Sequence, residues 1–330
     1  MDIQRKIISY LYFGYLPIAD QTIDIGIDKL DINKKDTYKL FNEKELVQKG
    51  VESLKNGFAD CLNNIDDYQN RKHIVPISGG LDSRAILAGL IDLGLKDNIV
   101  TVTYGTPGTL DYELGNLVAK HAGTKHISLD LSNINITQQS LGWTYKSGAE
   151  WTQLFTSYYN HRITHKFGYE AVYWSGFMGD PLAGSHLQAQ ESSTWDLAVF
   201  EFAKRNQFSK NFNLLPPQFN PCDVLPQEPI YDTNLLNFDE QLDFAIRQHS
   251  FIKPTVMAKG YNYIAPFTNQ NWINFILNVP YEYRYNEYIY KKILQEAYPD
   301  FFKLPVKNRM GLTLDDSGWK LYYIYIYIIN

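Results

Sequence analysis

The six residues from Ser78 to Ser83, SGGLDS, combine side chains and backbone freedom in a way that suits phosphate binding. The two glycines permit positive φ angles and let the backbone approach a ligand without an intervening Cβ atom. The two serine hydroxyls and the N–H groups of a following helix can bind phosphate oxygens. Asp82 would repel such an anion unless a divalent cation lay between them, so the string also predicts Mg²⁺. A glycine turn closed by an aspartate cap is the purely structural alternative.

The string is not the nucleotide loop GxxxxGK[ST], because it carries an acid and no lysine. It needs a strand before it and a helix after it to present these groups. Residues 73–77, HIVPI, form a short apolar run with β-branched side chains, which is typical of a buried strand. Residues 84–95, RAILAGLIDLGL, have a helical pattern that ends around Gly94. The sequence therefore predicts strand, tight loop and helix in that order.

Strand and helix patterns alternate downstream as well. Strands are predicted over 98–105 and 125–131, with a helix over 111–123 between them. This spacing is typical of crossover units, so we expect an α/β fold with a parallel β-sheet flanked by helices and a helical C-terminal part. Residues 171–175, AVYWS, predict another buried strand that runs into GFMGD, and 206–233 predict an irregular excursion that is not a domain boundary. Further helices are predicted over 43–68, 151–166, 238–249, 271–277 and 286–297.

Two terminal segments have strand-like alternation. Residues 14–32 alternate apolar and polar side chains between proline and glycine signals, so we expect short strands and turns in the segment 1–42. Residues 320–330 alternate tyrosine and isoleucine, which is also a strand period. An unpaired strand of that composition would be prone to aggregate, so we expect it to be packed or paired.

Composition narrows the function classes. The chain has 330 residues, 45% hydrophobic and 20% charged, and a net charge of −5, which gives no basic field for nucleic acid. Its two cysteines, Cys61 and Cys222, have no metal-ligand spacing, which fits a reducing cytosol. No secretion signal or membrane span is recognised, so we expect a cytoplasmic protein. The 25 tyrosines either fill half-buried positions or form a surface that stacks on sugars or bases.

Several strings, taken in order, resemble one family. SGGLDS is similar to the pyrophosphate loop of the adenine-nucleotide α-hydrolase (PP-loop) superfamily, and its surroundings resemble the synthetase domain of the asparagine synthetase family. The resemblance includes TVTYG with DYELGNLVAKHAGTKHISL, SGFMGDPLAG, IAPF, NFILNVP and KKILQEAYPDFFKLPVKNRMGL, and it spans about residues 13–312. It implies a synthetase domain over 43–330, with 1–42 as a remnant of the linker that follows a glutaminase domain in full-length members.

The resemblance also implies roles for particular residues. Asp82 and Asp180 would hold Mg²⁺ on the pyrophosphate of ATP, although Asp180 is otherwise explained as a turn residue. Lys291 would neutralise charge during acyl transfer, with Lys292 as the competing assignment, and Arg309 would be a second cation near the pyrophosphate. Either cation could instead be a solvated surface charge. The ATP contacts implied are Ser78, Gly79, Gly80, Leu81, Asp82, Ser83, Tyr104, Ser175 and Gly176.

The chain departs from the family pattern in two places. Phe177 replaces the glutamate of the SGEGxD string and Met178 replaces a glycine, which indicates a different acceptor pocket. The chain opens Met1-Asp2 instead of Met-Cys, so the N-terminal cysteine nucleophile and the glutaminase domain are expected to be missing. Ammonia would then come free or from a separate glutaminase, or the nucleophile would be another amine.

These inferences predict an ATP-dependent, AMP-forming ligase that adenylates a small-molecule carboxylate and transfers the acyl group to ammonia or an amine. Aspartate and a sugar acid from polysaccharide biosynthesis both remain open as the carboxylate. The alternative is a catalytically degenerate module of the same fold that binds a nucleotide or a partner. A sulfur- or tRNA-modifying member of the superfamily would show catalytic cysteines or a basic face, and neither is visible in the sequence.

Overall fold

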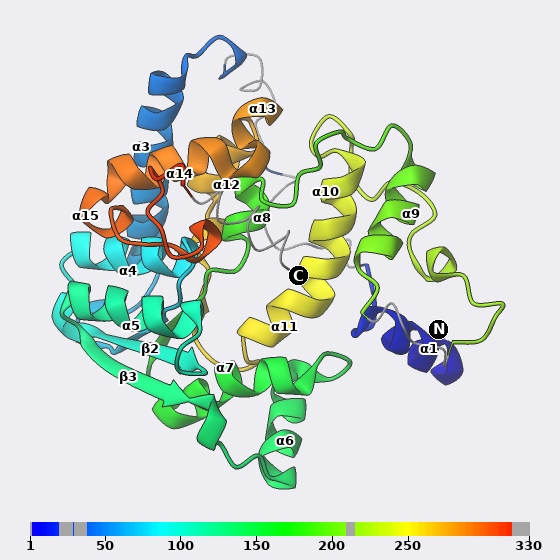
Figure 1. Ribbon diagram of the computed structural model, residues 1–330, viewed down its shortest axis with the longest axis horizontal. Coiled ribbons are helices and arrows are strands. Elements are labelled where there is room, and N and C mark those ends of the chain that lie inside the picture. Colours follow the sequence, from blue (N-terminus) through cyan, green and yellow to red (C-terminus); the bar gives the residue numbers. More distant parts are fainter. Residues whose placement is uncertain (1, 20–28, 30–37, 209–214, 319–330) are drawn as a thin grey trace.

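The computed structural model describes residues 2–19, 29, 38–208 and 215–318. Within them, five strands form one sheet in the order β3-β2-β1-β4-β5, and every neighbouring pair is parallel. The predicted α/β fold with a parallel sheet flanked by helices is confirmed (Figure 1). The strands are β1 His73–Pro76, β2 Ile99–Gly105, β3 Lys125–Asp130, β4 Val172–Trp174 and β5 Tyr263–Ile264.

Both faces of the central strands are buried, as expected for a parallel sheet. On β1, Val75 belongs to the largest hydrophobic cluster, whereas its neighbour Ile74 belongs to a second cluster on the other face. The second cluster includes Tyr173 from β4 and Ile163 from helix α7. Continuous apolar runs such as 73–77 therefore arise because successive side chains enter different cores.

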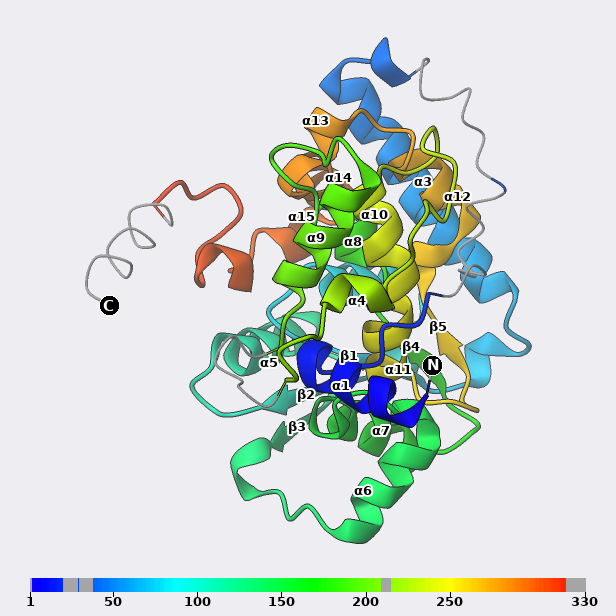
Figure 2. The ribbon, with the colours of Figure 1, turned by 90° about the vertical axis from the view of Figure 1, so that its right-hand side faces the viewer.

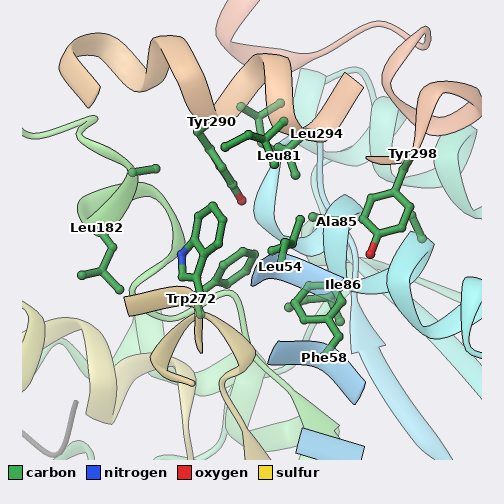
Figure 3. Packing of buried hydrophobic residues seen from close by; sticks show 14 of the residues in the cluster. Leu54, Phe58, Leu81, Ala85, Ile86, Leu182, Trp272, Tyr290, Leu294 and Tyr298 are labelled. Carbon is green, nitrogen blue, oxygen red and sulfur yellow. The ribbon is translucent and has the colours of Figure 1, made fainter. Parts of the chain in front are cut away.

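The largest core lies between the sheet and the helices of one face. Figure 3 shows Phe58, Ile86, Trp272 and Leu294 of this cluster, which come from four different helices. On the opposite side, α6 packs on α7, far from α3 (Figure 2). The helices of the large core are α3 Glu43–Asn63, α4 Asp82–Asp92, α5 Leu110–Ala122, α12 Gln270–Ile276, α14 Tyr288–Ala297 and α15 Pro299–Phe302. The helices across the sheet are α6 Gln138–Thr144 and α7 Leu154–Phe167.

A third hydrophobic cluster joins the N-terminal helix to the middle of the chain. Helix α1, Ile3–Phe13, lies beside α9, Trp195–Arg205, and the segment that starts with α10, Phe238–Leu242 (Figure 1). α10 continues into the π-helix η7, Asp243–Ile252. The other helices described are α8 Gly179–Ala183, α11 Lys253–Val256 and α13 Tyr281–Arg284. Short 3₁₀ or π segments are η2 Tyr68–Asn70, η3 Lys96–Asn98, η4 Leu131–Asn133, η5 Tyr145–Ala149, η6 Pro221–Val224, η8 Pro266–Thr268, η9 Tyr285–Glu287 and η10 Lys307–Arg309.

The N-terminal prediction was wrong where the structure describes it. The segment 1–42 was expected to hold strands and turns, but α1 is a helix whose first turn is capped by the Asp2 side chain, 2.9 Å from the Arg5 backbone nitrogen. Gly14, at φ +75°, ends that helix. Residues 20–28 and 30–37, and the strand predicted over 320–330, lie outside the described residues.

Other boundaries differ by a few residues. The helix predicted over 43–68 ends at Asn63, because the asparagine and aspartate residues that follow favour turns, and Asp67 adopts a φ of +53°. The excursion over 206–233 is irregular in its described part apart from η6. Helix α9 was not predicted. Among the described residues, no helix is long and apolar enough to cross a membrane.

The strand order fixes where a ligand can bind. From β1 the chain moves first to β2 and β3 on one side of the sheet, and then returns to β4 and β5 on the other. Such a reversal leaves a crevice beyond the carboxyl ends of the two central strands, β1 and β4. Ser78 follows β1 and Ser175 follows β4, so the two strings singled out in the sequence meet at this crevice.

Candidate functional site

The SGGLDS loop connects β1 to α4, as predicted. The Ser78 N–H donates to the Ser83 hydroxyl at 3.3 Å, and the Gly80 N–H donates to the Ser78 hydroxyl at 3.2 Å. These two bonds curl the loop so that both hydroxyls and the start of α4 lie on one side. Asp82 is the first residue of α4, where the helix dipole favours a negative group.

The loop glycines do not supply positive φ angles, which corrects the expectation from the sequence, and Gly79 instead serves close packing. Neither Gly79 nor Gly80 has a positive φ. A Cβ on Gly79 would lie 3.0 Å from the Lys307 side chain and 3.2 Å from the Leu110 carbonyl oxygen. The Gly79 carbonyl also accepts from the Lys307 N–H at 2.9 Å. Gly79 therefore brings the C-terminal segment against the loop, whereas a Cβ on Gly80 would meet only the Ser78 hydroxyl, at 3.4 Å.

Asp82, the acid of the SGGLDS loop, has a strongly shifted pKa. Burial and the nearby charge of Asp180 raise the pKa of Asp82 well above its ordinary value. The Tyr290 hydroxyl, from α14, donates to its Oδ1 atom at 2.7 Å and opposes this shift. Glu287 adds a further negative charge nearby. A carboxylate placed among other acids, with only neutral donors beside it, is electrostatically costly unless a cation binds there.

Asp180 stands at the start of α8, opposite Asp82. Desolvation in the cleft raises its pKa, although 48% of its side chain remains exposed. Its Oδ2 accepts from the Ser185 hydroxyl at 3.2 Å and lies 3.8 Å from Nε2 of His186. A Cβ on Gly179 would lie 2.5 Å from the Asp82 carboxyl carbon, so the start of α8 can approach Asp82 only with glycine there.

The residue before α8 is strained. Met178 has a φ of +67°, in the left-handed region that favours glycine, and it occupies the position at which the resembling family has glycine. Its side chain is buried beside that of Phe177. The two residues that depart from the family pattern therefore form an apolar wall next to Asp180.

These elements enclose a cavity of about 260 Å³. Its polar side carries hydroxyls and carboxylates from β1, α4 and α8, and its apolar side comes from the segment after β4 and from η7 and α11. The hydroxyl of Tyr104, at the end of β2, donates to Oδ1 of Asn160 at 2.8 Å. The lining residues are Pro76, Ser78, Gly80, Asp82, Ser83, Tyr104, Asn160, Trp174, Ser175, Gly176, Phe177, Met178, Asp180, Gln248, Ile252 and Val256. Of the ATP contacts implied by the resemblance, Gly79 and Leu81 are not among them.

The two expected cations line a separate hollow of about 750 Å³. Nζ of Lys291 lies 2.9 Å from the Glu287 carboxylate and donates to the Asn286 carbonyl at 2.6 Å. Nζ of Lys292 instead contacts Glu43 at 3.0 Å, at the start of α3. Arg309 lines the same hollow. Asp82, Asp180, the serines and Tyr104 thus line one cavity, whereas Lys291 and Arg309 line the neighbouring hollow.

Some residues around the site carry no local sequence signal. Tyr290, Asn160 and Gln248 reach it from helices far along the chain, and nothing in their neighbourhood in the sequence points to that. Lys307 does have a local signal, because it belongs to the same KNR string, 307–309, as Arg309. Its side chain pairs with Asp111 next to the loop.

The residues present fit a nucleotide with Mg²⁺. The two carboxylates, both with raised pKa values, form an oxygen donor set that a hard divalent cation prefers. The loop offers hydroxyls and helix-start N–H groups for phosphate, and the apolar wall suits a base. No cluster of three or more histidine, cysteine, aspartate or glutamate side chains able to hold a metal occurs in the part of the chain that the structure describes.

Comparisons with known proteins give limited support. No protein-family model matches the chain. Over 64 residues, 19% of this chain, it is 34% identical to 7-cyano-7-deazaguanine synthase from Archaeoglobus fulgidus, and it spans only 27% of that curated relative's length. This local likeness supports the PP-loop ATP pyrophosphatase superfamily and does not single out the asparagine synthetase family.

One solved structure aligns over a longer stretch. NAD⁺ synthetase from Burkholderia pseudomallei aligns with 69% of this chain and 89% of its own, at 12% identity and a TM-score of 0.25. A likeness at that score carries no argument about fold or activity. The fold assignment therefore rests on the parallel sheet itself.

Proposed function

We propose that the chain is an ATP-dependent ligase that activates a carboxylate as an acyl-adenylate and transfers the acyl group to ammonia or an amine. The observation that carries the proposal is the pair Asp82 and Asp180, held beside a phosphate-type loop at the crevice between β1 and β4. Nucleotide-sized ligands bind preferentially at such crevices. The local likeness to an enzyme of the PP-loop superfamily supports the same reading.

The reaction needs the chain to hold ATP and the acid in line. The substrate carboxylate would attack the α-phosphorus of ATP, and pyrophosphate would leave. Because AMP is a better leaving group than an oxide, the amine could then displace it from the acyl group. Ser78, Ser83 and the start of α4 would bind phosphate oxygens, and positioning of this kind provides much of the rate in such reactions. Mg²⁺, held by Asp82 and Asp180, would neutralise the pyrophosphate charge.

The proposed substrate is a small carboxylic acid. Aspartate and a sugar acid are the two candidates. The apolar pair Phe177 and Met178 replaces an acid and a glycine of the resembling family, which favours a carboxylic acid different from aspartate. Ammonia or an amine, with ammonia either free or from a separate glutaminase, would be the nucleophile.

A second candidate function, nucleotide binding without catalysis, is supported by the position of Lys291. Lys291 is bound to Glu287 and Asn286 and lies outside the lining of the nucleotide cavity. Together with Phe177, this is what a nucleotide-binding module without catalytic activity would show. Such a module would bind ATP and release no pyrophosphate.

The test is product formation from two ATP samples, one labelled at the α-phosphate to follow AMP and one labelled at the γ-phosphate to follow pyrophosphate. The full chain is incubated with Mg²⁺, ammonium and, one at a time, aspartate, uronic acids and their nucleotide sugars. We expect AMP and pyrophosphate in equal amounts with one acid. ATP binding without AMP under any acid would favour the binding module, and ADP as the product would contradict adenylation.

A further inference from the structure

A second cavity lies next to the nucleotide cavity, on the far side of His186. Its volume is about 290 Å³, and it lies between α9, the α10–η7 segment and the residues that follow α8. The residues that line it are Ser185, His186, Gln188, Phe202, Arg205, Asn206, Asp239, Asp243 and Arg247. None of them belongs to the SGGLDS loop or to the string of α8.

The two cavities share one wall. Nδ1 of His186 lies 2.8 Å from Oδ2 of Asp243, and its Nε2 lies 3.8 Å from the carboxylate of Asp180, which lines the nucleotide cavity. The side chain of Gln248 also lines the nucleotide cavity and donates to the same Asp243 oxygen at 3.2 Å. Only the side chains of this wall would therefore separate a molecule in the second cavity from a nucleotide in the first.

The π-helix η7 produces this arrangement. Its hydrogen bonds join residues five apart, so the turn is wider than in an α-helix and residues five apart come to one side. This explains how Gln248 can reach the carboxylate of Asp243, five residues earlier. π-helical turns occur frequently at functional sites, because their wider turn is less stable and is retained where it places side chains.

In this second cavity the two aspartates make more hydrogen bonds and ion pairs than the two arginines do. Asp239 accepts from the backbone and hydroxyl of Ser192 and from Arg205, and Asp243 contacts His186, Gln248 and Arg247. Each arginine, in contrast, contacts its carboxylate through one terminal nitrogen, and Nε of Arg205 also donates to the Glu201 carbonyl at 3.2 Å. About a third of each side chain is exposed, 35% for Arg205 and 29% for Arg247. Guanidinium donors therefore face the cavity, while the carboxylates are already bonded.

A buried hydroxyl near the same wall also has unmet hydrogen-bonding capacity. Tyr15 is 2% exposed, and its hydroxyl has no hydrogen-bond partner among the described residues. The charges of Arg247 and Asp243 both act on this hydroxyl. A buried polar atom without a partner is costly, and it is best explained by water or a ligand completing the site.

We propose that this second cavity binds the acid substrate by a carboxylate remote from its reacting group, through Arg205 and Arg247. The inference rests on the proposed function, because it requires the reacting end to reach the nucleotide cavity past His186. Paired arginines suit carboxylate geometry, since each guanidinium presents parallel N–H donors. The substrate class is thus a small acid with two anionic groups, such as a dicarboxylate, an acidic amino acid or a uronic acid linked to a second anion.

The test is direct binding to the full chain in the presence of Mg²⁺ and a non-hydrolysable ATP analogue. Succinate, aspartate and a nucleotide-linked uronic acid are compared with butyrate, which matches succinate in length but has one carboxylate. The variants are Arg205→Gln and Arg247→Gln, with Arg162→Gln, on α7 at a different cavity, as the matched control. Unfolding midpoints establish that each variant is folded, and Arg205→Gln decides the test if Arg247→Gln does not fold.

We expect at least one two-anion acid to bind at least about 10-fold more tightly than butyrate, and each cavity variant to remove that advantage, while Arg162→Gln keeps it. No acid binding, or binding that Arg205→Gln leaves unchanged, would overturn the inference.

Binding of the nucleotide analogue tests the proposed function separately. Its binding should survive in both arginine variants and be lost in Asp82→Asn, and absence of binding to the unaltered chain would contradict the function and not the cavity.

Discussion

Asp82 and Asp180 are costly residues for the stability of the chain. Both lie where surrounding atoms displace water, and each carries a raised pKa because desolvation disfavours its charge, with neighbouring acids adding to the effect. Acids in such surroundings weaken the fold when they are ionised without a counter-ion. Their presence is better explained by ligand binding than by stability.

Asp82→Asn should therefore separate stability from binding. We expect the free energy of unfolding to be unchanged or raised by up to about 1 kcal/mol, because a repelling charge is removed and the Tyr290 hydroxyl keeps an acceptor. Mg²⁺-dependent ATP binding should fall at least about 10-fold. Denaturant unfolding and calorimetric titration measure the two quantities.

The matched control is Asp92→Asn, at the other end of α4. Asp92 makes an exposed ion pair with Lys55, 2.8 Å apart, which is worth little. This variant should leave ATP binding unchanged. A large loss of stability in Asp82→Asn, or equal ATP binding in both variants, would contradict the assignment of Asp82.

The two neighbouring lysines of α14 can be distinguished in the same way. Lys291→Ala should lower turnover by about 10²–10³-fold if this cation stabilises charge in the acyl transfer, as one oxyanion donor does. Lys292 pairs with Glu43 at the surface, so Lys292→Ala should change turnover less than about twofold. Steady-state rates with the identified acid decide between them. The reverse result would move the role to Lys292, and near-normal rates in both variants would remove it from this helix.

The site residues that could be predicted from the sequence are those that lie in contiguous strings. SGGLDS and the SGFMGD string contain their own glycines and acids, so Asp82 and Asp180 could be found without a structure. Tyr290 could not, because its contact with Asp82 joins residues 208 positions apart. Only the packing of α14 over the loop creates that contact.

The start of α8 depends on a close approach to Asp82. Gly179→Ala would place a Cβ 2.5 Å from the Asp82 carboxyl carbon, so either α8 or Asp82 must move. We expect a loss of about 1–3 kcal/mol in stability, typical of overpacking, together with loss of Mg²⁺-dependent ATP binding. Thermal unfolding and titration with ATP measure both effects.

Gly142→Ala provides the matched control in α6. A Cβ at Gly142 meets nothing within 4 Å, so alanine should stabilise that helix by about 0.5–1 kcal/mol. ATP binding should not change in this variant. If Gly179→Ala bound ATP as the unaltered chain does, α8 would not be part of the nucleotide site.

Periodicity predicted the elements that pack on the sheet, because one buried face imposes a regular pattern. It missed α1, because the alternation that suggested strands begins at Gly14, after that helix. It also could not distinguish the π-helix η7 from an α-helix, since the predicted helix over 238–249 covers α10 and most of η7. The wider turn becomes visible only in the hydrogen-bond pattern.

For the whole molecule, the reversal of strand order between β1 and β4 decides where the site lies. His73 and Trp174 join these two strands, because the Trp174 indole N–H donates to Nδ1 of His73 at 3.0 Å. Nε2 of His73 lies 2.8 Å from the Tyr68 carbonyl, so the ring must be neutral with its proton on Nε2. This link between β1 and β4 therefore depends on an uncharged histidine.

This link predicts a pH dependence of stability. Burial lowers the pKa of His73 below its ordinary value, so the unfolded chain takes up a proton first as the pH falls. The stability contributed by neutral His73 is complete above the unfolded pKa of about 6.5 and is lost as the pH falls below it. Burial lowers the pKa of His126 and His161 as well, and both add to the slope. Unfolding midpoints between pH 8 and pH 5 measure it.

His73→Gln isolates the contribution of the link, because a glutamine oxygen can still accept from Trp174 without titrating. The slope of stability against pH should become shallower in this variant, because the other titrating groups are the same in both proteins. An identical slope in both proteins would show that His73 does not govern the acid sensitivity.

The most direct test of the central claim is the exchange of labelled pyrophosphate into ATP, with Mg²⁺ and the panel of acids but without ammonia or amine. Because exchange requires reversible attack of the acid on the α-phosphorus, the account predicts exchange that depends on one acid. The rate should fall at least about 10²-fold in Asp82→Asn. Exchange that survives in Asp82→Asn, or its absence with every acid while ATP remains bound, would contradict adenylation at the Asp82–Asp180 site.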